Sequence, residues 1–220
     1  MRKSTPLQYG IRALVYCVGL LFLAFGVVLS VNSNLGVSPV TSFPYVISCI
    51  VKAPLGICVT LTYCAFIVMQ ILIQRREFPV VNLLQIVFST IFGYFVDFAE
   101  MVVGDFALPT YVGRLGMLAV SIVLIAVGLV VYMDAQLVSM PMEGLTDCIA
   151  KKLGVSFASL KTKIDCLIVV TGAVLGLVFL GEIMGIREGT VITAMVAGKL
   201  VGVVKKRLSP VVEKICFGEG

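Results

Sequence analysis

Residues 13–31 read ALVYCVGLLFLAFGVVLSV, a run of nineteen residues without a charge. A helix needs roughly 20 mostly apolar residues to cross the hydrocarbon core of a bilayer, so this run predicts a transmembrane span. The sequence therefore predicts an all-α, polytopic membrane protein with six transmembrane helices. The other five predicted spans are the apolar runs at 55–73, 79–96, 115–133, 166–180 and 190–204, of which the last two are shorter and the sixth contains Lys199.

The composition of the whole chain agrees with this class. Hydrophobic residues make up 60% of the 220 residues, charged residues only 13%, and the mean hydropathy is +1.10. A soluble domain has roughly a quarter of its residues charged, so this chain cannot cover a soluble surface of its size. It has no histidine, which excludes histidine-based triads and metal cages. We expect one membrane domain over 1–220, with no metal, no cofactor and no catalytic residue.

The positive charges fall mainly on one side of the predicted membrane. Of the 17 lysines and arginines, 14 lie on the side of the amino terminus when the six spans alternate in direction. The excess of cations in cytoplasmic segments predicts a protein of the cell (inner, cytoplasmic) membrane with both termini, 1–9 and 208–220, in the cytoplasm. This placement needs no nucleic-acid partner, and the expected partners are the bilayer and a small polar solute or ion. The sequence leaves a homo-oligomer open.

The chain also repeats itself at an offset of 102 residues. Between 24–47 and 126–149, six of 24 positions are identical, including Pro39 and Pro141, where chance in this composition gives roughly two. We expect repeat one at about 10–104 and repeat two at about 112–207. Three spans in each repeat place the second in the opposite orientation, a plan that recurs in secondary transporters. An old duplication kept only for packing is the alternative.

Each repeat has a polar break after its first span. The breaks read NSNLGVSPVTSFPYVIS from residue 32 and DAQLVSMPMEGLTDCIA from residue 134. A proline suits the first turn of a helix, and Ser38 is a candidate N-cap. We therefore expect short helices at about 39–51 and 141–153, too short to cross the membrane, which either enter it as half-helices or lie at the interface.

Glu143 and Asp147 stand four residues apart, so they face one side of the second short helix. Their counterparts in the first repeat are Thr41 and Tyr45. A site between the repeats would thus have hydroxyl groups on one wall and carboxylates on the other, and it could bind a cation or take up protons.

Charged residues at membrane depth cost roughly 2.5–3.5 kcal/mol each on insertion scales, so they are candidates for function. Lys161 and Asp165, also four apart, favour a structural ion pair at the start of the fifth span over a binding site. The candidate substrate- or ion-binding residues are Asn32, Asn34, Ser38, Thr41, Tyr45, Asp134, Gln136, Glu143, Asp147, Lys161, Asp165 and Lys199.

Four motifs carry a resemblance to a known family: NLGVSP at 34–39, MPMEGL at 140–145, KTKID at 161–165 and MGIREGT from residue 184. Together they resemble the YczE/YyaS/YitT-like family of bacterial integral membrane proteins over about residues 10–207. The resemblance implies the fold and the membrane location rather than an activity. This chain keeps an acid, Glu143, where the family has Arg-Asp after the proline, and lacks the arginine.

Three functions fit these observations. The first is a secondary transporter or permease for a small polar solute held between the repeats. The second is a membrane scaffold or regulator without transport activity. The third is a lipid-acting enzyme using Glu143 and Asp147, which is poorly equipped without histidine, so we expect no enzyme. Transport is the favoured hypothesis because the repeated segment is polar and contains proline.

Overall fold

The computed structural model describes residues 6–218, all of whose regular structure is helical. Arg2 and Lys3, which the topology prediction uses, lie outside the described residues. Two short 3-10 turns, Arg75–Glu77 and Val80–Leu83, join the third and fourth helices. The helices are α1 (Pro6–Asn32), α2 (Pro39–Val51), α3 (Leu55–Gln74), α4 (Leu84–Val103), α5 (Tyr111–Asp134), α6 (Pro141–Leu153), α7 (Phe157–Leu180) and α8 (Glu188–Phe217).

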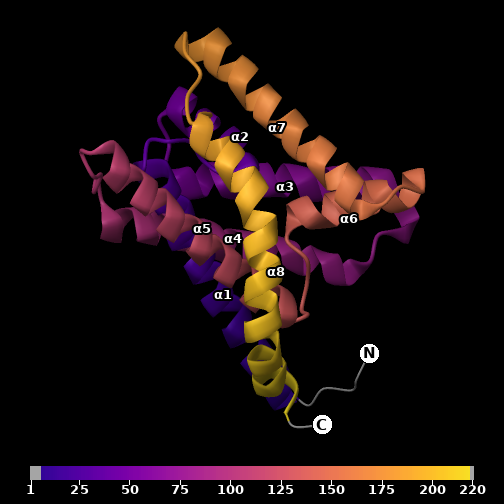
Figure 1. Ribbon diagram of the computed structural model, residues 1–220. Helices are drawn as coiled ribbons and strands as arrows, with labels where there is room; N and C mark the ends of the chain where they lie inside the picture. The colour runs from indigo at the N-terminus through magenta and orange to yellow at the C-terminus, as the bar shows by residue number, and fades with distance from the viewer. Residues whose placement is uncertain (1–5, 219–220) are drawn as a thin grey trace.

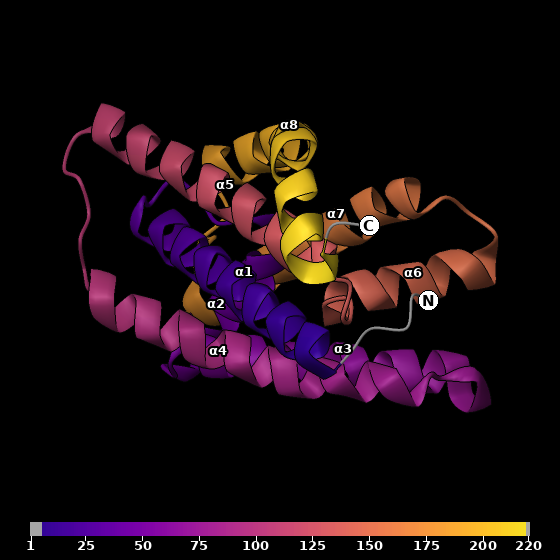
Figure 2. The same ribbon diagram turned by 90° about the horizontal axis from the view of Figure 1, so that it is seen from below.

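Helix α1 lies at the centre of the molecule, between α4 and α5 (Figure 2). It packs most closely on α5, where glycines bring the two backbones together: a Cβ on Gly19 would lie 2.6 Å from the backbone nitrogen of Tyr132. A Cβ on Gly26 would lie 2.9 Å from the nitrogen of Ile125. Since the partner number falls as the α1 number rises, the two helices run antiparallel.

Five helical segments are long and apolar enough to cross a membrane among the described residues. They are Pro6–Asn32, Leu55–Glu77, Val80–Val103, Tyr111–Asp134 and Ser159–Leu180, which contain the first five predicted spans or most of each. The predicted sixth span is helical but falls inside α8, whose lysine-rich second half lowers its hydropathy. Residues 208–217, expected in a cytoplasmic tail, continue α8, and Val212 and Cys216 are buried there. Likewise, residues 6–9 begin α1.

The two predicted short helices are confirmed with the predicted bounds. Helices α2 and α6 have 13 residues each, and both begin at a proline. The two helices also end in the same way at the 102-residue offset. The residues that follow them, Lys52 and Gly154, both have a left-handed backbone conformation. Ser38 occupies the N-cap position of α2, but its hydroxyl makes no capping bond and contacts Thr41 Oγ1 at 2.8 Å instead.

The helix pairs formed by the two parts of the chain correspond only in part. Helix α4 packs on α1 as α8 packs on α5, and α3 contacts α6 as α7 contacts α2. However, α3 and α4 form a close hairpin, whereas α7 and α8 diverge from their connecting loop (Figure 1). Much of the apolar surface of α7 is therefore left exposed.

Candidate functional site

The first turn of α6 carries the most unusual carboxylate of the described chain. Pro141 begins the helix, a position where the missing N–H of proline would have no intrahelical partner in any case. Glu143 follows two residues later. The Oε2 atom of Glu143 is buried and has no hydrogen-bond partner. Most buried polar atoms have a hydrogen-bond partner, so an unpartnered carboxylate oxygen is a candidate for binding a proton or a ligand.

A cavity of about 250 Å³ is lined in part by Glu143. Its wall comes from the end of α5, the loop that follows and the first turn of α6. Polar and aromatic groups share this wall, so it suits a small solute that is neither purely ionic nor purely apolar. The lining residues are Tyr132, Met133, Gln136, Leu137, Val138, Ser139 and Glu143.

Two buried glutamines hold the first turn of α6 in place. The Nε2 atom of Gln70, on α3, donates to the carbonyl oxygen of Pro141 and to Gln85 Oε1 on α4, each at 3.0 Å. Both side chains lie against Gly144, where an added Cβ would meet them at 2.8 and 2.9 Å. The absence of a side chain at residue 144 leaves room for this amide pair against α6. The sequence prediction missed Gln70 and Gln85, although Gln70 is the single amide of the apolar run 55–73 and Gln85 lies within the run 79–96.

Helix α7 brings an ion pair towards the same carboxylate. Lys161 Nζ contacts Asp165 Oδ1, confirming the predicted pairing, with both side chains about three-quarters buried. Glu143 lies within electrostatic range of both, but only Lys161 and Asp165 are joined directly. Burial raises the pKa of Glu143, which lies outside the candidate spans; Lys161 opposes this rise and Asp165 adds to it. The geometry thus favours a protonated Glu143 more than solvent would.

Three tyrosines from three helices surround this region. Tyr16 on α1, Tyr63 on α3 and Tyr132 on α5 are all buried and within electrostatic range of Glu143. The rings of Tyr16 and Tyr132 meet edge to face with centroids 5.4 Å apart. The Tyr16 hydroxyl donates to the carbonyl oxygen of Val138, in the loop that lines the cavity, at 3.2 Å. None of the three was in the predicted site.

A second cavity, of about 170 Å³, lies at the other end of α1. Of the predicted residues, Asn34 and Tyr45 line it, together with Glu182 and Arg187 from the α7–α8 loop. The two cavities have no lining residue in common. Of the residues predicted for the hydroxyl and acidic walls, Glu143 lines the first cavity and Tyr45 the second, while Thr41 and Asp147 line neither.

The loops beside the two cavities share a backbone feature. Asn34 and Gln136, related by the 102-residue offset, both have positive φ, of 55° and 50°. In each case an arginine donates to the carbonyl oxygen of that residue: Arg187 Nη1 to Asn34 at 3.1 Å, and Arg12 Nη2 to Gln136. Arg12 is buried, also donates to the carbonyl oxygen of Ala135 at 2.8 Å, and stacks on Phe217.

The remaining predicted residues have other surroundings. Asp134 is buried and accepts a hydrogen bond from Ser209 on α8. Asn32 donates to the carbonyl oxygens of Gly104 and Phe106, at 2.8 and 3.2 Å. Both residues therefore join the ends of α1 and α5 to neighbouring segments.

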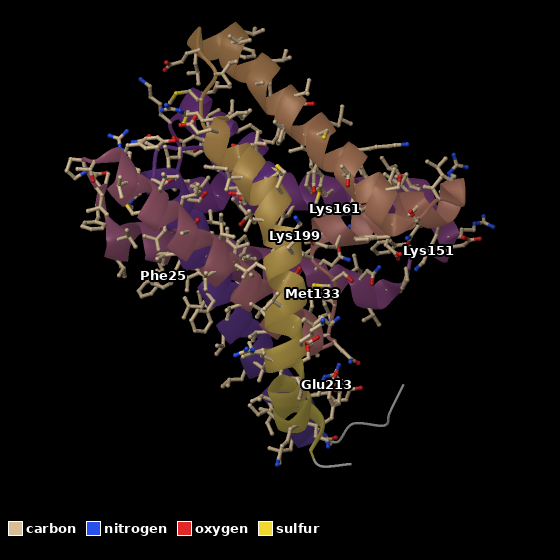
Figure 3. The ribbon with its side chains drawn as sticks, in the orientation of Figure 1. Phe25, Met133, Lys151, Lys161, Lys199 and Glu213 are labelled. Carbon is tan, nitrogen blue, oxygen red and sulfur yellow. The ribbon has the colours of Figure 1, made fainter. Side chains whose placement is uncertain are left out.

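Asp147 pairs with Lys151 at 2.6 Å in an exposed ion pair of α6. In Figure 3, Lys151 lies towards the outer end of α6, away from Met133, which lines the first cavity. Lys199 is exposed on α8. Among residues 6–218, no group of three or more cysteine or acidic side chains could hold a metal ion.

Comparison with known proteins places the chain among membrane proteins. A family model, described as a family of unknown function (DUF6198), matches residues 10–206. The chain belongs to the DUF6198 family. Its similarity extends to a curated relative, the uncharacterized membrane protein YczE of Bacillus subtilis (strain 168), with 30% identity over 194 residues. The alignment covers 86% of this chain and 82% of the relative.

The predicted resemblance to YczE-like proteins is confirmed by this DUF6198 membership. Within residues 6–218, five helices are apolar and long enough to span a bilayer, and this member of the family is a membrane protein. No solved structure matches the chain.

Proposed function

We propose that this protein is a secondary transporter for a small polar solute, with Glu143 as the group that binds the solute or a coupling proton. The observation that carries the proposal is the buried, unpartnered Oε2 of Glu143 beside a cavity of about 250 Å³. Ionisable groups inside membrane proteins are costly and mark ion, proton and substrate pathways. In this proposal Glu143 alternates between a protonated and a ligand-bound state.

The positions of the two cavities support alternating access. One borders the α5–α6 loop, which is bonded to Arg12 near the start of α1; the other borders Val31 near its end. At a rise of about 1.5 Å per residue, residues 12 and 31 are separated by about 29 Å, close to the thickness of the hydrocarbon core. The cavities then serve as vestibules on opposite sides of the membrane.

In this mechanism the two arginine contacts are the gates. In this proposal Arg12, which is buried and stacked on Phe217, closes the route of the solute at the first cavity. Arg187, which is exposed, holds the loop beside the second cavity more loosely. Rocking of one repeat against the other would weaken the Arg12 contact while strengthening the Arg187 contact, or the reverse.

The inverted-repeat architecture is part of this proposal. Its support comes from the matching helix lengths, prolines and left-handed residues 102 positions apart, and from the antiparallel packing of α1 and α5. The first half of α8 then forms the sixth span, with Lys199 reaching the interface. Both termini lie in the cytoplasm, and the protein resides in the cell membrane, as the distribution of lysines and arginines predicts. It acts without catalysis or nucleic acid, and its partners are the bilayer and the solute.

The test is uptake by purified protein in proteoliposomes under an imposed pH gradient. Four labelled solutes represent the charge classes: tetramethylammonium (cationic), glycine (zwitterionic), methanesulfonate (anionic) and erythritol (neutral). At least one should enter faster than into protein-free liposomes, and Glu143→Gln should reduce that rate at least tenfold. Asp147→Asn, one turn along the same helix, is the matched control and should keep it. Uptake of no solute, or equal uptake by both variants, would overturn the proposal.

A further inference from the structure

The balance of charge around the first cavity indicates which class of solute it accepts. Glu143, Lys161 and Asp165 form one cluster of charges, in which Lys161 and Asp165 satisfy each other in an ion pair. Arg12, which donates to a carbonyl oxygen in the cavity wall, and the buried Asp134 have opposite charges and so leave the net charge unchanged. Glu143 has no such partner at its buried Oε2. When Glu143 is ionised, the cluster therefore carries one uncompensated negative charge, and a buried charge of this kind is stable only with a cation or a proton beside it.

The aromatic lining favours an organic cation over a bare metal ion. Tyr132 is the aromatic residue among those that line the cavity, with 2% of its surface exposed, and the Tyr16 ring meets it edge to face. The faces of tyrosine rings attract ammonium groups, and aromatic cages are a recurrent device for binding quaternary ammonium ligands. The methionine side chain of Met133 adds a soft apolar contact surface to the same wall.

The volume of the cavity agrees with this class. At about 250 Å³ it is many times the roughly 30 Å³ that one water molecule occupies in the liquid. A bare monovalent ion would be far smaller than the space. A small alkylammonium group fills more of the cavity and places methyl groups against Tyr132 and Met133 while its charge faces Glu143.

We infer that the solute bound beside Glu143 is a small monovalent organic cation of the alkylammonium type, held by the Glu143 carboxylate and the ring of Tyr132. This inference rests on the proposed transport function and names its substrate class. The cation and a proton exclude each other on Glu143, because either one neutralises the same carboxylate. Transport is then an exchange of one cation for one proton, which leaves the net charge of the site unchanged.

The binding test uses the full chain in detergent, with tetramethylammonium as the probe and tert-butanol as a neutral compound of similar shape. Tetramethylammonium should raise the melting temperature at pH 8 relative to the same concentration of sodium, and tert-butanol should not. The apparent Kd for tetramethylammonium should rise at least tenfold in Glu143→Gln and stay within twofold of the unmodified protein in Asp147→Asn. A Kd in Glu143→Gln equal to that of the unmodified protein would overturn the inference.

Tyr132 supplies a second, independent variant pair. Tyr132→Phe keeps the ring and should bind tetramethylammonium within about threefold of the unmodified protein, whereas Tyr132→Leu should bind at least tenfold more weakly. Equal binding by the Leu and Phe variants would contradict the role of the ring.

The four-solute uptake assay separates the failure of this inference from that of the proposed function. Uptake of tetramethylammonium with proton release supports both. Uptake of glycine, methanesulfonate or erythritol without tetramethylammonium leaves a transporter but refutes the cation class. Uptake of none of the four refutes the proposed function, and the inference with it.

Discussion

The side-chain amide of Gln70 donates a hydrogen bond to the carbonyl oxygen of Pro141, 3.0 Å away, across the interface between α3 and α6. The bond is buried and joins residues 71 positions apart in the chain. It fixes the turn of α6 that carries Glu143. The equivalent position of Gln70 at the 102-residue offset is Gly172, so this bond has no counterpart where α7 contacts α2.

We predict that Gln70→Met lowers the free energy of unfolding by about 1–3 kcal/mol, because Gln85 and the Pro141 carbonyl lose a buried partner. Thermal melting in detergent measures the change. Gln74→Met is the matched control, one turn further along α3. The buried Oε1 of Gln74 has no partner, so its replacement should leave the melting temperature unchanged or raise it. A smaller loss in Gln70→Met than in Gln74→Met would contradict the anchoring role.

The stability of the protein should depend on pH through Glu143. Burial raises the pKa of Glu143 above its value of about 4.5 in the unfolded chain, so the folded state holds the proton more tightly. The free energy of unfolding therefore falls as pH rises from the unfolded-state pKa through the folded-state pKa, and then levels off. Lys161, Asp165 and the three tyrosines face Glu143, and they are unchanged in a Glu143→Gln variant.

Glu143→Gln removes this titration. We expect its melting temperature to exceed that of the unmodified protein at pH 8, because the unmodified protein must ionise a buried carboxyl group there. The difference should vanish near pH 4, where both proteins are neutral at position 143. Melting curves between pH 4 and 8 provide the measurement. A constant difference across that range would show that the charge of Glu143 plays no part.

The α3–α4 hairpin depends on two glycines that leave no room for a side chain. A Cβ on Gly93 would lie 2.0 Å from Thr60 Oγ1 and 2.6 Å from the carbonyl oxygen of Gly56. Gly93→Ala should therefore separate the helices and destabilise the protein by about 1–3 kcal/mol, the usual cost of overpacking. Gly198→Ala, in an open part of α8, should be neutral or slightly stabilising. The melting temperatures of both variants, compared with that of the unmodified protein, test this prediction. An equal change in the two variants would contradict it.

Cys216 reports on the proposed Arg12 gate. It is buried on α8 next to Phe217, on whose ring the Arg12 guanidinium stacks with its centre 5.1 Å from the centroid. Arg12→Ala should loosen the end of α8 and raise the rate of maleimide labelling at Cys216 about tenfold, measured by peptide mass spectrometry. Arg187→Ala, at the other end of α1, is the control and should leave the rate unchanged. Unchanged labelling in Arg12→Ala would show that α8 is held by other contacts.

The sequence alone determined the features that depend on composition and local conformation. The apolar runs predict the membrane class because hydrophobic length decides whether a helix can cross a bilayer. Pro39 and Pro141 predict the starts of α2 and α6 because proline is accommodated in the first turn of a helix. The spacing of Lys161 and Asp165 predicts their pairing because residues four apart meet on one helix face.

Only the tertiary structure decided which of these polar groups lie together. Gln70, Tyr16 and Arg12 approach the loop and first turn around Glu143 from helices more than 70 residues away, and no local periodicity encodes such distances. The same packing separates Glu143 from Asp147. Both lie on α6, yet one is buried beside a cavity and the other forms an exposed ion pair with Lys151. Their spacing is a local property, but their burial depends on which helices cover α6.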